Sequence, residues 1–244
     1  MALREEFEKS GNWLFRWRSY LPLLLLSLII FALRDFKTVY CNEFFDKTWE
    51  LLCLFISLIG IGIRVYSVSC VPKGTSGRNT KSQVAETLNT TGVYSVVRHP
   101  LYLGNFLIYI GIMASVRSLW ALLVAVLLFW LYYERIMFAE EEFLRKKFDE
   151  TYLAWSERTP AFFPNFKNWK SPHREVNWLA GIGSEYATFF AALASFTVLD
   201  FLKRGVAQGY FSLDKMWTSI FGAGLFFYII CRLIKKKTKL LNKS

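Results

Sequence analysis

The densest group of residues able to do chemistry lies in residues 92–105, GVYSVVRHPLYLGN, where an apolar stretch begins. Pro100 suits the first position of a helix, because its missing N–H would be unsatisfied there anyway and its φ is already helical. Arg98 and His99 would then precede a helix N-terminus, where unpaired N–H groups and the helix dipole favour an anion. The pattern predicts a site for a small anionic molecule where membrane meets water. It leaves open that Arg98 only sets membrane topology and Pro100 only opens the helix.

Carboxylates follow the next apolar stretch. After Tyr133 the sequence ERIMFAEEEFLRKKFDETYLAW keeps a helical pattern, so the helix is expected to carry its glutamates past the membrane surface. Acidic residues near hydrocarbon are costly unless they line water or meet a cation. Three consecutive glutamates often form only a solvated helix face. Because Arg98 and His99 are expected at the same membrane face, the two groups together favour a ligand that carries both a carboxylate and an ammonium.

Cations occur at two further places. Arg64 lies near the end of an apolar stretch, where an ionisable residue is either functional or simply reaches the headgroups. Lys73 and Arg78 belong to the segment KGTSGRNT, whose glycines, hydroxyls and cations suit a phosphate or an ordinary flexible loop. The sequence has two histidines, and its four cysteines lack metal-binding spacing, so no metal site is predicted.

Long apolar stretches must position these residues. The chain is 54% hydrophobic and 18% aromatic, and a helix needs about 20 mostly apolar residues to cross a bilayer. We therefore expect an all-α, polytopic membrane bundle of about six transmembrane helices. They are expected at residues 17–33, 49–70, 101–116, 119–138, 184–202 and 216–234. The pattern suggests a core over residues 1–166, a linker over 167–183 and a C-terminal hairpin with a basic tail over 184–244, in which Lys203 and Arg204 form the turn.

Charge sets the expected orientation. With these six spans, 20 Lys and Arg residues fall on one side of the membrane and 7 on the other, which places both termini and the two long loops in the cytoplasm. The formal net charge of +11 is spread around the apolar stretches, so anionic lipid headgroups are expected as partners rather than nucleic acid. No cleaved signal is expected, because Glu5, Glu6 and Glu8 precede the first apolar stretch. No protein partner can be inferred.

Three short motifs occur in a specific order. RHPLYLG spans residues 98–104, EEEFL spans 140–144 with Phe148 and Tyr152 after it, and RTP spans 158–160 with Pro164 after it. In these motifs and their spacing, residues 92–166 resemble the isoprenylcysteine carboxyl methyltransferase and phospholipid methyltransferase family of integral membrane enzymes. Two departures stand out: Asp149 occupies a position where the family usually has Gly, and the last two apolar stretches have no assigned counterpart.

The resemblance implies S-adenosylmethionine as methyl donor, whose sulfonium, carboxylate and ammonium suit a site of mixed sign. It implies a catalytic set of Arg98, Arg135 and Glu141, with Arg135 orienting the acceptor's anion. The residues expected to bind the donor are Tyr94, Arg98, His99, Tyr102, Gly104, Asn105, Glu140 and Glu141. Those expected to bind the acceptor are Arg64, Lys73, Arg78 and Arg135.

The acceptor is expected to be a membrane lipid. Methyl transfer depends mainly on orientation and partial desolvation, and an anionic oxygen needs no general base, whereas an amine must first lose a proton. VPKGTSGRNT also resembles bacterial relatives that act on lipid A phosphate. We therefore expect O-methylation of a lipid phosphate of the lipid A type, in a bacterial inner membrane, with the site facing the cytoplasm.

Other functions remain open at this stage. The enzymatic alternatives are methylation of a prenylated cysteine carboxyl group and N-methylation of phosphatidylethanolamine. A non-catalytic protein, either a scaffold for anionic lipids or a transporter, is the remaining class. The absence of an inverted repeat in the sequence weighs against a transporter.

Overall fold

The structure is a computed structural model that describes residues 2–18, 20–34, 43–72, 83, 85–238 and 241. Helices account for the regular structure in these ranges, which confirms an all-α membrane protein. Two 3-10 turns, η1 (Val93–Ser95) and η2 (Phe166–Asn168), lie in the connecting segments. The helices are α1 (Leu3–Trp17), α2 (Leu21–Arg34), α3 (Glu43–Ser69), α4 (Pro100–Ser115), α5 (Leu119–Ser156), α6 (Trp178–Gln208) and α7 (Lys215–Lys237).

Four of these helices, α3, α5, α6 and α7, are long and apolar enough to cross a membrane. α4 is apolar but has 16 residues, and α2 has 14, so two of the six expected spans fall short of a full crossing by length. α5 has 38 residues and continues well past the length of one span, as its sequence pattern predicts.

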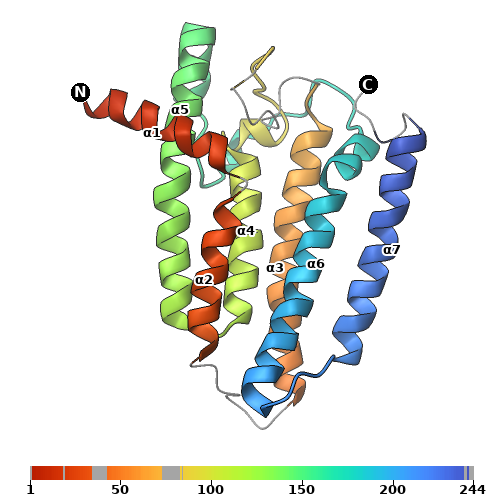
Figure 1. Ribbon diagram of the computed structural model, residues 1–244. Coiled ribbons are helices and arrows are strands. Elements are labelled where there is room, and N and C mark those ends of the chain that lie inside the picture. Colours follow the sequence, from red (N-terminus) through yellow and green to blue (C-terminus); the bar gives the residue numbers. More distant parts are fainter. Residues whose placement is uncertain are drawn as a thin grey trace.

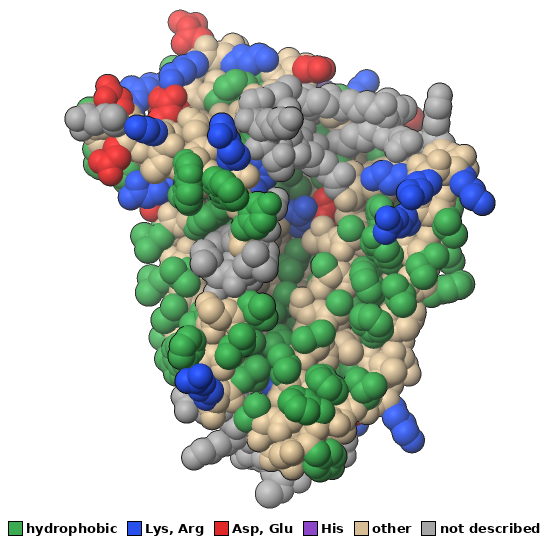
Figure 2. Space-filling model, in the orientation of Figure 1, with side chains coloured by type: hydrophobic (Ala, Val, Ile, Leu, Met, Phe, Trp, Pro, Cys, Tyr) green, Lys and Arg blue, Asp and Glu red, His purple; other side chains and the backbone are tan. Residues whose placement is uncertain are grey.

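The long helices stand side by side, and α1 lies across one end of the bundle (Figure 1). The N-terminus and the C-terminus are both at this end, together with the extension of α5 and the start of α4. Figure 2 shows charged side chains gathered mainly at this end and hydrophobic ones along the body of the molecule. We call this end of the bundle the cavity end, because the cavity described below lies there, and we call the opposite end the far end.

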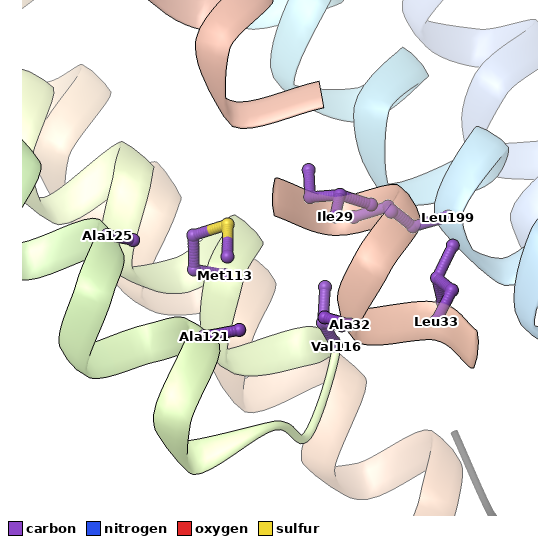
Figure 3. Packing of buried hydrophobic residues seen from close by; sticks show 8 residues of the cluster. All are labelled: Ile29, Ala32, Leu33, Met113, Val116, Ala121, Ala125 and Leu199. Atoms are coloured by element: carbon purple, nitrogen blue, oxygen red, sulfur yellow. The ribbon is translucent and has the colours of Figure 1, made fainter. Parts of the chain in front are cut away.

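The packed core near the far end joins four helices. Figure 3 shows α2 inserted between α4, α5 and α6, with Met113 of α4 facing the small side chains of α5. Met113 and Ala121 are completely buried. The cluster consists of Ile29, Ala32, Leu33, Met113, Val116, Ala121, Ala125 and Leu199.

Small residues bring α3 and α4 into close contact. A Cβ atom on Gly104 would lie 2.7 Å from the carbonyl oxygen of Gly60 and 2.5 Å from Cγ of Arg64. Such approaches are a common way for membrane helices to pack without a hydrophobic driving force between them. The contact fixes Arg64 directly against α4.

The first of the C-terminal helices packs directly on the rest of the bundle. α6 begins at Trp178, six residues before the expected span, and Asn177 N–H donates to the carbonyl of Ser69 at 3.0 Å. A Cβ on Gly181 would lie 2.6 Å from the carbonyl oxygen of Val65, so α6 packs tightly on α3. The expected turn at Lys203 was wrong: α6 continues to Gln208, and Lys203 is buried within the bundle.

Candidate functional site

A cavity of about 320 Å³ lies where α4 begins, a volume within the usual range for small-molecule sites. Its walls come from α3, α4, α5, α6, the end of α1, Gln83 and residues 85–89. The structure brings most of the expected site residues to this one space. They are Arg64, Tyr94, Arg98, His99, Tyr102, Asn105, Glu140 and Glu141.

Arg98 and Glu141 form a two-point ion pair at the cavity wall. Arg98 Nε donates to Glu141 Oε1 at 2.9 Å, and Nη2 donates to Oε2 at 3.1 Å. Arg98 Nη1 donates to the carbonyls of Ser156 and Thr159 at 2.7 and 2.8 Å. Because most of the guanidinium N–H groups are used in this way, Arg98 positions Glu141 and the end of α5. A direct contact between Arg98 and an anionic ligand stays a prediction.

His99 lies between two carboxylates. Its Nε2 is 2.9 Å from Glu141 Oε1, and its Nδ1 is 3.5 Å from Glu140 Oε2. Burial lowers the pKa of His99, but the hydrogen bonds and charges of Glu140 and Glu141 outweigh burial and raise the pKa above its usual value. Tyr102 OH donates to Glu140 Oε1 at 2.7 Å and so fixes the second carboxylate. Glu140 keeps a fifth of its side chain exposed, facing the cavity.

A chain of polar contacts crosses the cavity floor. Arg64 Nε donates to Glu185 Oε2 at 2.8 Å, and Arg64 Nη1 donates to Asn105 Oδ1. Asn105 Nδ2 in turn donates to Tyr133 OH at 3.0 Å. These four residues come from α3, α6, α4 and α5, so the floor ties four helices together. Glu185 is 1% exposed, and a carboxylate buried this deeply among apolar helices requires a cation such as Arg64.

The chain after α5 explains why the sequence motifs occur together. Arg98 N–H donates to the carbonyl of Pro160 at 2.9 Å, and His99 N–H donates to that of Ala161 at 3.1 Å. Trp155 Nε1 donates to the carbonyl of Tyr94 at 3.0 Å. The RTP segment therefore pairs with the RHP segment along the backbone and holds the start of α4 against the end of α5.

Asp149 marks a kink in α5. Its φ is 42° and its ψ is −119°, inside an otherwise helical run. This conformation strongly favours glycine, which agrees with the glycine usual at this position in the family the sequence resembles. After the kink, Tyr152 and Trp155 return to the cavity wall.

Several expected site residues lie elsewhere. Arg135 does not reach the cavity: its Nη1 donates to Ser10 Oγ at 3.1 Å, and its guanidinium carbon lies 4.2 Å from the centre of the Phe7 ring. It therefore holds α1 against α5, and the expected catalytic and acceptor-binding roles do not fit this position. Gly104 also lies outside the cavity lining and serves the contact between α3 and α4. Lys73 and Arg78 lie outside the described residues.

Sequence reasoning missed part of the lining. Glu185 was not expected here, although an acidic residue inside an apolar stretch is a recognisable signal. Arg18 and Phe15 reach the cavity from the end of α1, and Ala85, Thr87 and Asn89 close another side. No sequence pattern pointed to these residues. Among the described residues, no group of three or more His, Cys, Asp or Glu side chains is arranged to hold a metal ion.

Comparison with known families identifies a class of membrane enzyme. The chain belongs to the phospholipid methyltransferase family, whose family model matches residues 51–151. This range contains Arg64, the RHP motif, Glu140 and Glu141, and it ends before Glu185.

Two curated relatives extend the match. The cobalt-zinc-cadmium resistance protein CzcN of Cupriavidus metallidurans is 31% identical over 169 residues, which cover 69% of each chain. The nickel-cobalt-cadmium resistance protein NccN of Alcaligenes xylosoxydans xylosoxydans is 29% identical over 169 residues, which cover 69% of this chain and 70% of the relative. No solved structure matches the chain.

Proposed function

We propose that the protein transfers a methyl group from S-adenosylmethionine to a phosphate oxygen of a membrane lipid. One observation carries the proposal: residues from α3, α4, α5 and α6 converge on one cavity that presents both signs of charge next to an apolar wall. The lipid A type of phosphate that the sequence resemblance suggests is one acceptor of this chemistry.

The cavity fits the donor. Glu140 presents a carboxylate, held by Tyr102 and His99, that suits the donor's ammonium or ribose hydroxyls. Arg18 also lines the cavity, and its guanidinium suits the donor's carboxylate. Phe143, Leu144 and Trp155 offer an apolar and aromatic surface for the adenine. When bound, S-adenosylmethionine supplies a methyl group on a positively charged sulfur, which becomes a neutral thioether as the methyl is transferred.

Arg64 suits the acceptor. Glu185 and Asn105 hold its guanidinium on the cavity floor, where it can pair with one oxygen of a phosphate and orient another toward the donor. A phosphate is anionic near neutral pH and needs no base to activate it. Where the bound donor and lipid displace water from the cavity, this pairing becomes stronger.

A lipid can reach this floor from the side. Figure 2 shows a furrow lined by hydrophobic side chains along the face between α2 and α6, with Lys or Arg and Asp or Glu atoms visible deep in its upper part. Acyl chains can lie in such a furrow while the headgroup enters the cavity. We place this opening toward the cytoplasmic leaflet, because positive charge is concentrated at the cavity end.

The names of the two relatives agree with a phosphate acceptor. Both proteins are named for resistance to divalent metal ions. Methylation of a phosphate oxygen removes one negative charge from the lipid, so it weakens the attraction of divalent cations to the membrane surface. The first methylation of an amine leaves the charge of the headgroup unchanged.

A second candidate is N-methylation of phosphatidylethanolamine. The juxtaposition of Arg64 and Glu185 favours it, because a zwitterionic headgroup could place its phosphate on the arginine and its ammonium near the glutamate. The two reactions differ in where the new methyl group is attached.

The test uses the purified protein with radiolabelled donor and lipid extract from the source cells. We expect label in the organic phase and, in the mass spectrum, a lipid heavier by one CH₂ group whose fragments place the methyl on phosphate. A methyl group on the amine would select the second candidate. Folded protein that transfers no label to any lipid, and binds no donor, would contradict both and favour a non-catalytic scaffold.

A further inference from the structure

A second cavity of about 500 Å³ lies between α3, α6 and α7, and we call it the α7 groove. All three helices are candidate membrane spans. Its walls are mainly apolar, with Leu58, Phe189, Leu193, Ile220 and Phe227 among them. Hydrocarbon fills such a space better than water does, because apolar walls offer dispersion contacts and few hydrogen-bond partners.

The α7 groove is separate from the candidate active site. Glu185 borders both cavities, and its carboxylate is bound by Arg64 on the active-site side. α3 and α6 pack directly on each other beside the groove, with Ile61 and Ala192 in one buried cluster. A molecule in the α7 groove therefore does not simply extend into the active site.

Cations mark one end of the groove. Gly224, Phe227 and Lys235 share a face of α7, because they are separated by steps of three or four residues. Lys235 Nζ donates to the carbonyl of Gly183 at 2.6 Å and lies 5.5 Å from the ring centre of Tyr186, which itself lines the groove. Lys236 and Lys237 are exposed beside it, and α7 contains no acidic residue. Figure 2 shows Lys and Arg side chains at this end of α7 above a hydrophobic surface.

We propose that the α7 groove binds an anionic phospholipid of the surrounding bilayer, with one acyl chain between α3, α6 and α7 and the phosphate beside Lys235 and Lys236. Apolar walls below a basic rim match an acyl chain below an anionic headgroup. α7 is also the candidate span that the protein covers least. In its most apolar 18-residue segment 17% is buried inside the protein, compared with 33–39% for the other three candidate spans. The lipid supplies contacts that the protein does not, and its binding does not depend on methyl transfer.

The test compares phosphatidylglycerol with phosphatidylcholine carrying the same acyl chains. Native mass spectrometry counts the lipids retained by the detergent-solubilised full chain, and thermal unfolding measures the stabilisation that each lipid gives. We expect the wild-type protein to retain phosphatidylglycerol preferentially and to melt at a higher temperature with it.

Two variants test separately how the headgroup and the acyl chain contribute to lipid binding. Lys235→Ala with Lys236→Ala should weaken phosphatidylglycerol binding by about 25-fold, toward the level of phosphatidylcholine, because each lysine near an anionic surface contributes about fivefold. Ala223→Trp, at an exposed position in the groove wall, should displace both lipids by filling the space. Lys215→Ala, at the other end of α7, is the matched control and should leave the binding of both lipids unchanged.

Three results would overturn the proposal. They are equal retention of the two lipids by the wild-type protein, unchanged phosphatidylglycerol binding in the double lysine variant, and equal losses in that variant and in Lys215→Ala. The lysine variants alter the helix end rather than the packed core, so they decide the question even if Ala223→Trp does not fold.

Discussion

Among the described residues, a cluster of buried charge lies at each end of the bundle, and the cluster at the cavity end lines the candidate active site. At the far end, Glu50 accepts hydrogen bonds from Lys203 Nζ and from Trp217 Nε1, and Arg204 pairs with Asp200 and Asp214 at 2.9 Å. At the cavity end, Arg64 pairs with Glu185, and Arg98 pairs with Glu141. Both clusters join helices distant in sequence.

The difference between the clusters is what their charges face. None of the far-end residues lines the candidate active site, and their contacts lie within the protein. At the cavity end, Glu140 and Arg64 keep surfaces toward an open space. Buried charge at the far end is therefore explained by contacts between helices, whereas buried charge at the cavity end is also what the proposed ligand site requires.

The largest effect is expected at the far end, on stability. Glu50→Ala removes the carboxylate that Lys203 and Trp217 both use, and breaking a buried pair by removing one partner costs about 3–5 kcal/mol. Chemical denaturation in mild detergent measures this loss. Replacing Glu50 and Lys203 together by Met should recover most of it, and the folded fraction should bind donor normally. Impaired donor binding in that fraction would show that the far-end cluster also affects the candidate active site, and would contradict the distinction between the two clusters.

The next largest effect is expected at the cavity floor, on activity. Arg64→Met should lower methyl transfer by about 100-fold, because Arg64 orients the phosphate toward the donor and a reactant misplaced by about 1 Å commonly loses this much rate. Donor affinity, measured by calorimetry, should change little. Arg64→Met with Glu185→Leu is the control, because it leaves no unpaired acid in the bundle. Full activity in a folded Arg64→Met variant would remove Arg64 from the acceptor site.

Backbone strain provides a third comparison between the ends. Among the described residues, those with positive φ that are not glycine are Arg117 at the far end and Asp149 at the cavity end. Asp149→Gly should stabilise the protein by about 1–3 kcal/mol, because glycine has no Cβ and adopts this backbone conformation without strain. Asp149→Ala keeps the Cβ and should not give this gain. Equal midpoints of denaturation for the two variants would mean that the kink is unstrained.

The smallest effect concerns pH. Because Glu140 and Glu141 raise the pKa of His99 in the folded protein, its protonation stabilises the fold below about pH 6.5, the value for the unfolded chain. This contribution is lost as pH rises through the folded pKa. The stability difference between wild type and His99→Gln should therefore be largest in acid and shrink in alkali. A difference that grows with pH would show that His99 is neutral between its two carboxylates.

The sequence was sufficient where patterns are local. The start of α4 at Pro100 and the continuation of α5 through Glu140 and Glu141 were predicted correctly, because proline at a helix start and helical periodicity act over a few residues. Arg135 was misplaced despite its nearness to Glu141, since six residues along a helix turn the side chain to another face. That face receives α1, whose docking the sequence pattern did not reveal.

The rest depends on contacts between distant residues. Glu185 meets Arg64 across 121 residues, and no local pattern indicates which cation a buried acid will find. Lys203 was expected in a turn because charge usually ends an apolar stretch. It lies inside α6 because Glu50, 153 residues away, compensates its charge. The extent of the C-terminal helices and the completion of the cavity floor therefore emerge only in three dimensions.

Titration calorimetry with S-adenosylmethionine tests the central claim most directly, on detergent-solubilised wild type, Glu140→Gln and Glu50→Gln. We predict one binding site in the wild type, weakened by about tenfold or more in Glu140→Gln, because a charge-assisted hydrogen bond is lost. Glu50→Gln should bind donor as the wild type does. Folded wild-type protein that takes up no donor, or equal weakening by the two substitutions, would contradict the assignment of the cavity as the methyl-donor site.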